Sequence, residues 1–178
     1  MTRILTTYVL DARAFIVGIL PAKAREIYVT EGVLGELRGT PQTASRALAY
    51  LETRRVKKIE VNESDLAVVR ERASRIGESG KLSDADLGVA AAAMGLSQRR
   101  KRVKGLTDDY ALQNLLSNIG IDYERITHPG ITREIRYRYR CSVCGRISAR
   151  SLTQCPDCGS RVVRVRSTVR RITRNQSP

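Results

Sequence analysis

The stretch VKGLTDDYALQNLLSNIG, residues 103–120, contains one complete strand-to-helix unit. The run VKGLT has the length of a short buried strand, and the leucines that follow recur at helical spacing until Gly120, a residue typical of helix ends. Two adjacent aspartates, Asp108 and Asp109, stand between strand and helix. Because like charges repel, a plain turn does not need this pair. One acid could cap the helix, and the other could bind something.

The same alternation of strand and helix extends from the N-terminus to about residue 125. The strand patterns are TTYVLDA (6–12), EIYVT (26–30), RVKKIEV (55–61) and IDYERI (121–126). The helical patterns are GVLGELRG (32–39), TASRALAYLETR (43–54), SDLAVVRERASRIG (64–77) and SDADLGVAAAAMG (83–95), with Gly77 and Gly95 as expected ends and Ser83 as an expected N-cap. Such alternation predicts an α/β fold, a parallel sheet covered by helices on both faces.

Acidic residues recur where these strands end. Asp11 follows the first strand, and Asp108 and Asp109 follow another. Further acids stand just beyond the second strand and at a helix start: Glu36, Asp84 and Asp86. Sites in open parallel sheets gather at the carboxyl ends of the strands, so we expect these acids to converge at one edge. Carboxylates without histidine suit hard cations such as Mg²⁺ or Mn²⁺, which activate water and offset charge on phosphate.

Each acid also has a structural interpretation. Asp84 or Asp86 could simply favour the positive end of a helix, and Ser83 with Asp86 matches a capping box. Asp108 could be the N-cap of the helix that starts near Tyr110. Glu36 could lie on a solvated helix face. Asp11 is the hardest to explain in this way, because apolar residues flank it on both sides and a charge there needs a partner.

Several kinds of chemistry are excluded by what the sequence lacks. It contains no glycine-rich phosphate loop of either common type, which argues against a nucleotide cofactor. His128 is the single histidine, so a ribonuclease mechanism with two histidines is impossible within one chain. All four cysteines belong to one short segment, which leaves none for a nucleophile elsewhere.

That segment, CSVCGRISARSLTQCPDCG (141–159), has the spacing of a zinc ribbon. Two C-x-x-C turns, each followed by glycine, supply four thiolates for one closed tetrahedral Zn²⁺ site. The ligands are Cys141, Cys144, Cys155 and Cys158. Disulfides are the alternative, but a cytoplasmic chain disfavours them, and a redox C-x-x-C explains the repeated motif less well. A closed site of this kind is structural.

The positive charge is concentrated around this segment. The chain has a net charge of +14, and from Arg125 onward it has thirteen arginines, no lysine and two acids, a local charge of +11. A local excess of arginine points to a polyanion, most simply nucleic acid, although it could also serve solubility. The candidate RNA-binding residues alternate along the flanking strand patterns: Arg136, Tyr137, Arg138, Tyr139, Arg140, Arg146, Arg150, Arg161, Arg164 and Arg166. The two tyrosines could instead cover a small core.

These patterns predict an α/β domain over residues 1–126, a linker over 127–136, the ribbon over 137–168 and a basic flexible tail over 169–178. No apolar run reaches the length of a membrane span, and the N-terminus has no export signal. We therefore expect a cytoplasmic protein with no membrane partner.

The motifs YVLDARAFI, YVTEGVLGEL, KLSDADLGVAAAA and LTDDYALQN resemble, in this order, the acidic motifs of PIN-domain nucleases. With the zinc ribbon after IDYERITHPGI, the chain is similar to the Nob family over about residues 5–165. The resemblance implies a PIN-like parallel sheet followed by a small zinc ribbon. It also implies an endoribonuclease that uses Mg²⁺ or Mn²⁺, leaves a 3′-hydroxyl and a 5′-phosphate, and trims the 3′ end of precursor small-subunit (16S-type) ribosomal RNA.

Carried over by motif, the resemblance implies catalytic roles for Asp11, Glu36, Asp86 and Asp109. Secondary candidates are Asp84, Thr107 and Asp108. The chain departs from the family at Arg13, where a small polar residue is usual, and at ELRG, which lacks the more common acid after Glu36. Arg13 could pair with a site acid, bind RNA phosphate or lie on the surface.

The resemblance also implies partners, namely the precursor ribosomal RNA, the pre-ribosomal particle and an assembly factor. Two other functions remain open from the sequence: a non-catalytic RNA-binding assembly factor whose acids are structural, and a toxin-like PIN ribonuclease acting on other RNAs. The appended ribbon argues against the toxin, because such toxins are usually one compact domain.

Overall fold

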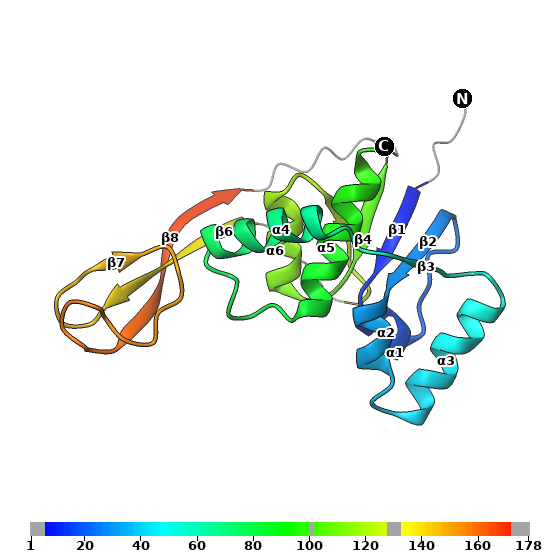
Figure 1. Ribbon diagram of the computed structural model, residues 1–178. Coiled ribbons are helices and arrows are strands. Elements are labelled where there is room, and N and C mark those ends of the chain that lie inside the picture. The colour runs from blue at the N-terminus through cyan, green and yellow to red at the C-terminus, as the bar shows by residue number, and fades with distance from the viewer. Residues whose placement is uncertain (1–5, 100–101, 128–132, 172–178) are drawn as a thin grey trace.

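The computed structural model describes residues 6–99, 102–127 and 133–171 and divides them between two sheets (Figure 1). His128, the centre of the expected linker and most of the expected tail lie outside the described residues. No helix in the described part of the chain combines the length and the hydropathy that crossing a membrane requires.

The larger sheet has five strands in the order β3-β2-β1-β4-β5, and every neighbouring pair is parallel. Its strands are β1 (Thr6–Leu10), β2 (Ala24–Thr30), β3 (Lys57–Ile59), β4 (Val103–Leu106) and β5 (Asp122–Glu124). The central strand β1 is the most apolar, and Val9 and Leu10 are completely buried. This arrangement confirms the parallel α/β sheet that the sequence predicts.

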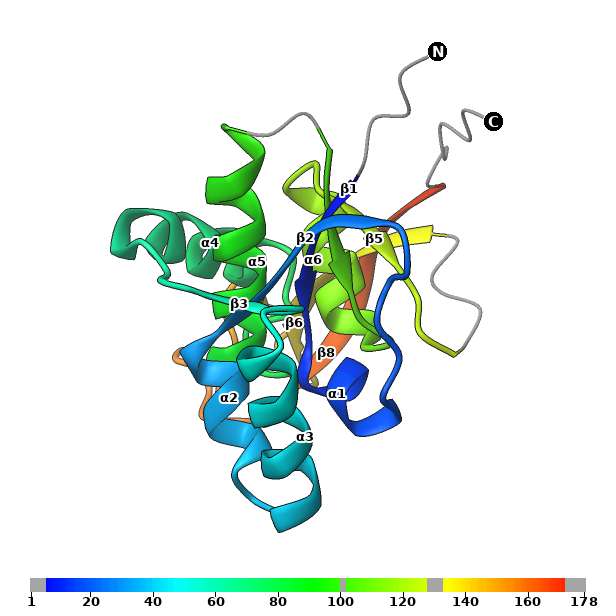
Figure 2. The same ribbon diagram turned by 90° about the vertical axis from the view of Figure 1, so that its right-hand side faces the viewer.

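Within the described residues, six helices flank this sheet: α1 (Ala12–Val17), α2 (Glu31–Leu37), α3 (Pro41–Glu52), α4 (Glu63–Arg75), α5 (Asp84–Ser97) and α6 (Tyr110–Asn118). Helix α5 is the central one, and its alanine-rich face packs on β1, β2 and β4 with α4 and α6 beside it. Helices α1, α2 and α3 pack on one another beyond the carboxyl ends of β1 and β2 (Figure 2). Small side chains bring α5 close to the sheet, and this closeness positions its first turn near the strand ends.

The glycines set some helix ends and not others. Gly77 and Gly120 follow α4 and α6 with φ of +73° and +79°, the left-handed conformation expected after a helix. The expected end of α5 at Gly95 is wrong, because the helix continues to Ser97. A Cβ at Gly95 would come within 2.6 Å of the Asp65 carboxylate, so this glycine serves close packing against α4 and not termination.

The second sheet is antiparallel, in the order β7-β6-β8. Its strands are β6 (Arg133–Cys141), β7 (Ile147–Ser148) and β8 (Val162–Arg171). Strand β6 begins inside the stretch that the sequence suggested as a linker, and β8 ends inside the suggested tail. The long β6–β8 pair extends away from the larger sheet and carries the cysteine turns at its far end (Figure 1).

Candidate active site

Asp11 lies at the carboxyl end of β1, between the sheet and α1. Its backbone N–H donates to the Leu106 carbonyl at the end of β4, so the ends of the two central strands lie side by side. The hydroxyl of Thr107, which follows β4, donates to Asp11 Oδ2 over 2.6 Å. Only 8% of Asp11 is exposed, and Thr107 is fully buried. The first predicted acid is therefore a buried carboxylate held by a buried hydroxyl.

Asp109 is joined to the same hydroxyl from the other side. Its backbone N–H donates to Thr107 Oγ1 over 3.0 Å, and its own Oδ1 accepts from the Leu112 N–H over 2.8 Å. Asp109 is thus the N-cap of α6, and the expectation that Asp108 caps this helix is wrong. Thr107 connects the two acids that follow β1 and β4.

Asp86 and Glu36 meet at Ser83, the N-cap of α5. The predicted capping box is present, since Asp86 Oδ2 accepts from the Ser83 N–H over 2.8 Å. The Ser83 hydroxyl lies 2.9 Å from that same oxygen and 3.1 Å from Glu36 Oε1. A single serine therefore connects the first turn of α5 with the last turn of α2. The sequence identified Ser83 only as a cap, because its contact with Glu36 is a long-range one.

The carboxylates of Asp11, Asp86 and Asp109 interact electrostatically. The pKa of Asp11 is raised to about 6, chiefly by burial and also by the charges of Asp86 and Asp109, while the hydrogen bond from Thr107 acts in the opposite direction. Burial also raises the pKa of Asp86, with a contribution from Asp109. No basic side chain in the described ranges forms an ion pair with these three acids. Among the described residues, no positive charge neutralises their mutual repulsion.

This donor set fits a hard divalent cation. The ligand atoms are carboxylate oxygens, and a cation between them would remove the repulsion that raises the Asp11 pKa. The acids are more widely spread than a closed cage, since only the cysteines, among the described residues, bring at least three ligand atoms within 4.8 Å of one another. Mg²⁺ is usually held by one or two carboxylates and keeps several waters, so a wide arrangement suits it.

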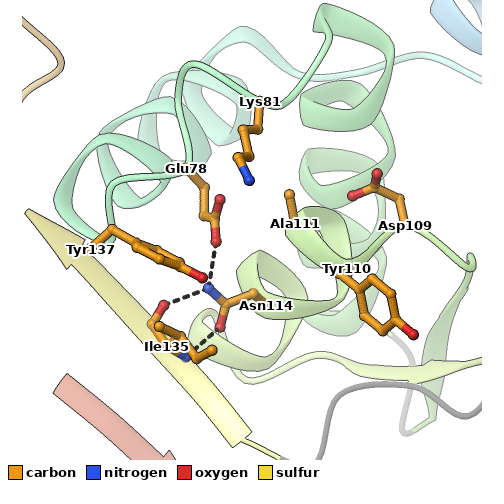
Figure 3. A pocket seen from close by; sticks show the side chains of 8 residues that line it. All are labelled: Glu78, Lys81, Asp109, Tyr110, Ala111, Asn114, Ile135 and Tyr137. Carbon is orange, nitrogen blue, oxygen red and sulfur yellow. Dashed lines mark hydrogen bonds between the residues drawn. The ribbon is translucent and has the colours of Figure 1, made fainter. Parts of the chain in front are cut away.

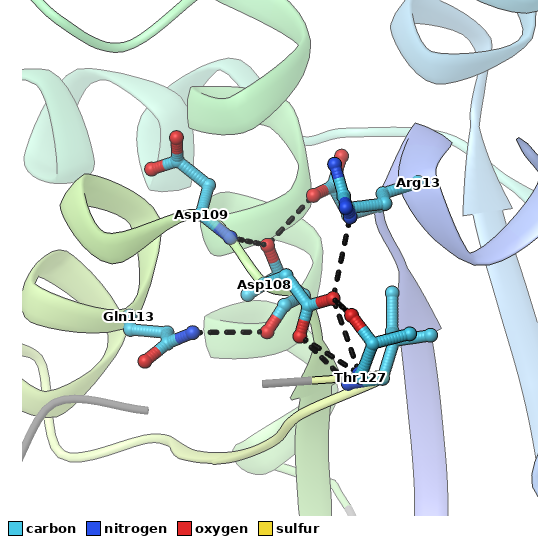
Figure 4. A network of polar contacts seen from close by, with 8 residues as sticks. Arg13, Asp108, Asp109, Gln113 and Thr127 are labelled. Atoms are coloured by element: carbon cyan, nitrogen blue, oxygen red, sulfur yellow. Dashed lines mark hydrogen bonds and ion pairs between the residues drawn. The ribbon is translucent and has the colours of Figure 1, made fainter. Parts of the chain in front are cut away.

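The carboxylates of Asp108 and Asp84 contact residues outside the acidic cluster. The Asp108 carboxylate accepts hydrogen bonds from the Ile126 N–H and from the backbone and hydroxyl of Thr127, and Arg13 Nε lies 3.3 Å from it (Figure 4). It therefore holds the chain that leaves β5. Arg13 pairs with this anchor and with none of the cluster acids. Asp84 is highly exposed and pairs with Arg70 over 3.2 Å.

The four cysteines come together as predicted. The Sγ atoms of Cys141 and Cys158 are 3.4 Å apart, those of Cys144 and Cys155 are 3.5 Å apart, and all four lie within 4.8 Å of one another. A tetrahedral Zn²⁺ with bonds of about 2.3 Å separates its sulfurs by about 3.8 Å, so the quartet is compatible with zinc. The glycine after each turn has positive φ, which allows the tight turns around the sulfurs.

A polar junction, formed by Gly77, Glu78, Asn114, Ile135 and Arg164, joins the ribbon to the larger domain. The Asn114 amide donates to Glu78 Oε1 and to the Ile135 carbonyl, while its oxygen accepts from the Ile135 N–H (Figure 3). Arg164 forms an ion pair with the buried Glu78 and donates to the Gly77 carbonyl over 2.9 Å. No sequence pattern indicated Glu78, because a single acid after a helix end has no periodicity.

This junction changes the interpretation of some predicted RNA-binding residues. Tyr139 is buried and donates to the Gly77 carbonyl, so it covers the junction and offers no stacking face. Tyr137 is half-buried, with the Arg164 guanidinium 3.4 Å from its ring centroid. The other seven candidates are exposed: Arg136, Arg138, Arg140, Arg146, Arg150, Arg161 and Arg166. Of these, Arg146 forms an ion pair with Asp157 between the two cysteine turns.

Comparison with known proteins finds similarity to ribonucleases. The family model of the PIN domain of ribonuclease matches residues 8–96. The chain is 34% identical to endoribonuclease Nob1 of Methanothermobacter thermautotrophicus over 89% of this chain and 92% of that protein. It is 33% identical to endoribonuclease Nob1 of Pyrococcus abyssi over 86% of this chain and 90% of that protein.

Two further similarities cover less of the chain. Ribonuclease VapC3 of Aeropyrum pernix is 37% identical over 68% of this chain and 87% of that protein. Among solved structures, a chain of VapBC2 from Rickettsia felis, crystallised with a DNA fragment from its promoter, has a TM-score of 0.50 and 17% identity, and it covers 67% of this chain and 98% of that chain. This last likeness concerns the fold alone.

Proposed function

Because the chain belongs to the Nob1 family of PIN-domain endoribonucleases, we propose that it cleaves precursor small-subunit ribosomal RNA at its 3′ end with the help of a divalent metal ion. The observation that carries this proposal is the cluster of Asp11, Asp86 and Asp109 at the carboxyl edge of the sheet. The charges of Asp86 and Asp109 contribute to the raised pKa of Asp11, the Asp109 charge contributes to that of Asp86, and the three acids have no cationic partner among the described residues. Such a site is built to receive a cation.

In this proposal Asp11, Asp86, Asp109 and Glu36 would hold Mg²⁺ or Mn²⁺. When bound, the ion lowers the pKa of a water molecule and offsets charge on the attacked phosphate. Thr107 positions the Asp11 carboxylate by its donated proton and the Asp109 backbone by its accepted one, and the Leu112 N–H positions the Asp109 carboxylate. Ser83 performs the same positioning for Asp86 and Glu36. Asp84 and Asp108 support the site from outside it.

The ribbon would bring the RNA to this edge. A Zn²⁺ ion in the cysteine quartet would hold the two turns together, and the seven exposed arginines offer bidentate contacts to phosphate. The local charge of +11 would attract a precursor ribosomal RNA within its particle, and an assembly factor could expose the strand to be cut. Products would be a 3′-hydroxyl and a 5′-phosphate.

The test is cleavage of an RNA fragment that spans the mature 3′ end, with the new 5′ end mapped in Mn²⁺ or Mg²⁺. Wild type should give one product end, and Asp109→Asn should lower the rate by more than roughly a hundredfold, since even indirect partners of metal ligands cost 10–100-fold. Asp122→Asn, an exposed aspartate at the opposite end of β5, is the matched control and should cleave normally.

Three outcomes would contradict the proposal. Normal cleavage by Asp109→Asn would remove the cluster from the reaction. Indiscriminate cleavage of unrelated RNAs would favour a toxin-like ribonuclease. Tight binding without cleavage under any metal condition would favour an assembly factor. The toxin-like alternative is not preferred, because such toxins are usually one compact domain and this chain adds a ribbon with four clustered cysteines.

A further inference from the structure

A cleft runs from the acidic cluster to the base of the ribbon. It has a volume of about 370 Å³ and is lined by Asp109, Tyr110 and Ala111 from the start of α6, by Glu78 and Lys81 from the α4–α5 connection, by Asn114, and by Ile135 and Tyr137 from β6 (Figure 3). Pockets for small ligands have volumes of about 300–1,000 Å³, so the cleft has room for one nucleotide. One wall comes from β6 and the others from α6 and the α4–α5 connection, which means that the ribbon completes the cleft.

The charges on the wall are not equivalent. Both carboxylate oxygens of Glu78 are already used, one by Asn114 and the other by Arg164. Lys81 follows in the same turn, because its N–H donates to the Glu78 carbonyl over 2.9 Å. Its side chain is exposed, extends into the cleft and forms no ion pair with any residue that the structure describes (Figure 3). Lys81 is therefore the cation that this cleft offers to an anion.

The exposed aromatic ring in the cleft is Tyr110. The chain has seven tyrosines, one phenylalanine and no tryptophan, and all eight aromatic residues lie within the described ranges. Seven of them are buried or half-buried, whereas Tyr110 is 56% exposed. It directly follows Asp109 at the first position of α6, a helix with a buried core face. Exposing the ring costs hydrophobic energy, and a base stacked on it would recover that energy.

We propose that this cleft binds one unpaired nucleotide of the RNA strand between the acidic cluster and the ribbon, with Lys81 on a phosphate and Tyr110 stacked on the base. The inference deepens the proposed function and rests on it, since it takes RNA as the substrate.

The proposal is tested by binding, with the full zinc-loaded chain carrying Asp11→Asn so that the RNA stays intact. Short single-stranded RNAs carry 2-aminopurine at successive positions, and its fluorescence reports stacking. One position should be quenched in the parent, lose its quenching in Tyr110→Leu and keep it in Tyr110→Phe. Tyr110→Leu should weaken binding about tenfold, as expected for one lost stacking contact.

Lys81 has its own readout. Lys81→Gln should reduce the slope of log K against log salt by about 0.7, the value for one phosphate contact on a single strand, and Lys81→Arg should restore it. Lys23→Gln makes the same change at an exposed lysine just before β2, at the opposite edge of the sheet, and should leave the slope unchanged. Circular dichroism confirms that each variant is folded.

Two results would show that the cleft is not a nucleotide site. In the first, Tyr110→Leu and Lys81→Gln bind the RNA and quench the 2-aminopurine fluorescence as the parent does. In the second, Lys23→Gln reduces the salt slope as much as Lys81→Gln does. These binding outcomes do not depend on cleavage. If wild type fails to cut the ribosomal precursor while the two cleft variants still lose RNA binding, the proposed function fails and the nucleotide site stands.

Discussion

The buried Asp11 carboxylate, which the proposed reaction needs in its charged form, lowers the stability of the folded protein at neutral pH. Its pKa in the folded protein is about 6, above the value of about 4 that an unfolded chain gives an aspartate. The folded state therefore binds the proton more tightly, and its stability falls as the pH rises from about 4 to about 6 and stays lower above that range. Without a divalent ion, a charged Asp11 is a liability at neutral pH.

Asp11→Asn should remove this penalty, because the amide oxygen still accepts the Thr107 hydrogen bond. In buffer without added Mg²⁺ or Mn²⁺, the variant should be more stable at pH 7, by on the order of 2–3 kcal/mol. The gain should shrink as the pH falls through 6 and vanish near 4. Urea unfolding at each pH measures it. Equal stability of both proteins at every pH would show that the Asp11 charge has no such cost.

The two neighbouring aspartates should differ in what they support. Asp108→Asn weakens a nearly buried carboxylate that receives three hydrogen bonds from Ile126 and Thr127 and contacts Arg13. It should lower the free energy of unfolding by about 1–3 kcal/mol and reduce RNA cleavage only modestly. Asp109→Asn should abolish cleavage and affect stability less, since an amide still caps the helix. Paired thermal unfolding and cleavage assays would show whether the two effects separate in this way.

What the sequence could predict at this scale is set by distance along the chain. The spacing of acids after strands indicated Asp11 and the pairs Asp84/Asp86 and Asp108/Asp109, and the family resemblance selected Asp86 and Asp109, whose charges act on Asp11 in the structure. It could not tell the role of Asp108 from that of Asp109, because Asp108 is defined by the hydrogen bonds of Ile126 and Thr127.

At the scale of elements, β6 of the ribbon packs directly on the turn after α4. Gly77 has φ of +73°, and a Cβ there would lie 2.7 Å from both the Cβ and the carbonyl oxygen of Tyr137. Gly77→Ala therefore combines left-handed strain of about 1–2 kcal/mol with a collision against β6. Gly120→Ala is the matched control, since its φ is +79° and nothing lies within 4 Å of a Cβ there.

Denaturant unfolding of both variants separates the two effects. Gly120→Ala should show the backbone strain alone, and Gly77→Ala should lose more stability than that and expose the Tyr139 ring at the junction. Equal losses would mean that β6 moves aside freely and that the junction contributes little to holding the ribbon.

The elements themselves were largely predictable, because strand and helix patterns are local. The end of α5 was not predictable in this way, since Gly95 marks a contact with Asp65 and not a helix end. Helix α3 gives a second example: Leu48 belongs to its apolar pattern yet is 58% exposed, because nothing in the described chain covers it.

At the scale of the whole molecule, a zinc ion in the cysteine quartet and the polar junction would stabilise different ends of the ribbon. The cysteine quartet lies at the far end of β6 and β8, and the junction lies at the near end. Removing zinc with a chelator should therefore unfold the turns around residues 141–159 while the larger sheet stays intact. Hydrogen exchange should show loss of protection in that segment and none in β1. Loss of protection in β1 as well would mean that both sheets unfold as one unit.

The backbone bond between the two sheets has a consequence for how such a protein can be built from parts. The Tyr137 N–H donates to the Ile76 carbonyl over 2.8 Å, and it can do so only because Gly77 next to it has no side chain. Grafting this ribbon onto another nuclease domain would therefore fail unless Gly77, Glu78 and Asn114 were transferred with it. The ribbon is contiguous in the sequence, but the residues that it packs on belong to the nuclease domain. Exchanging the ribbon at the linker would therefore separate it from the residues that bind it.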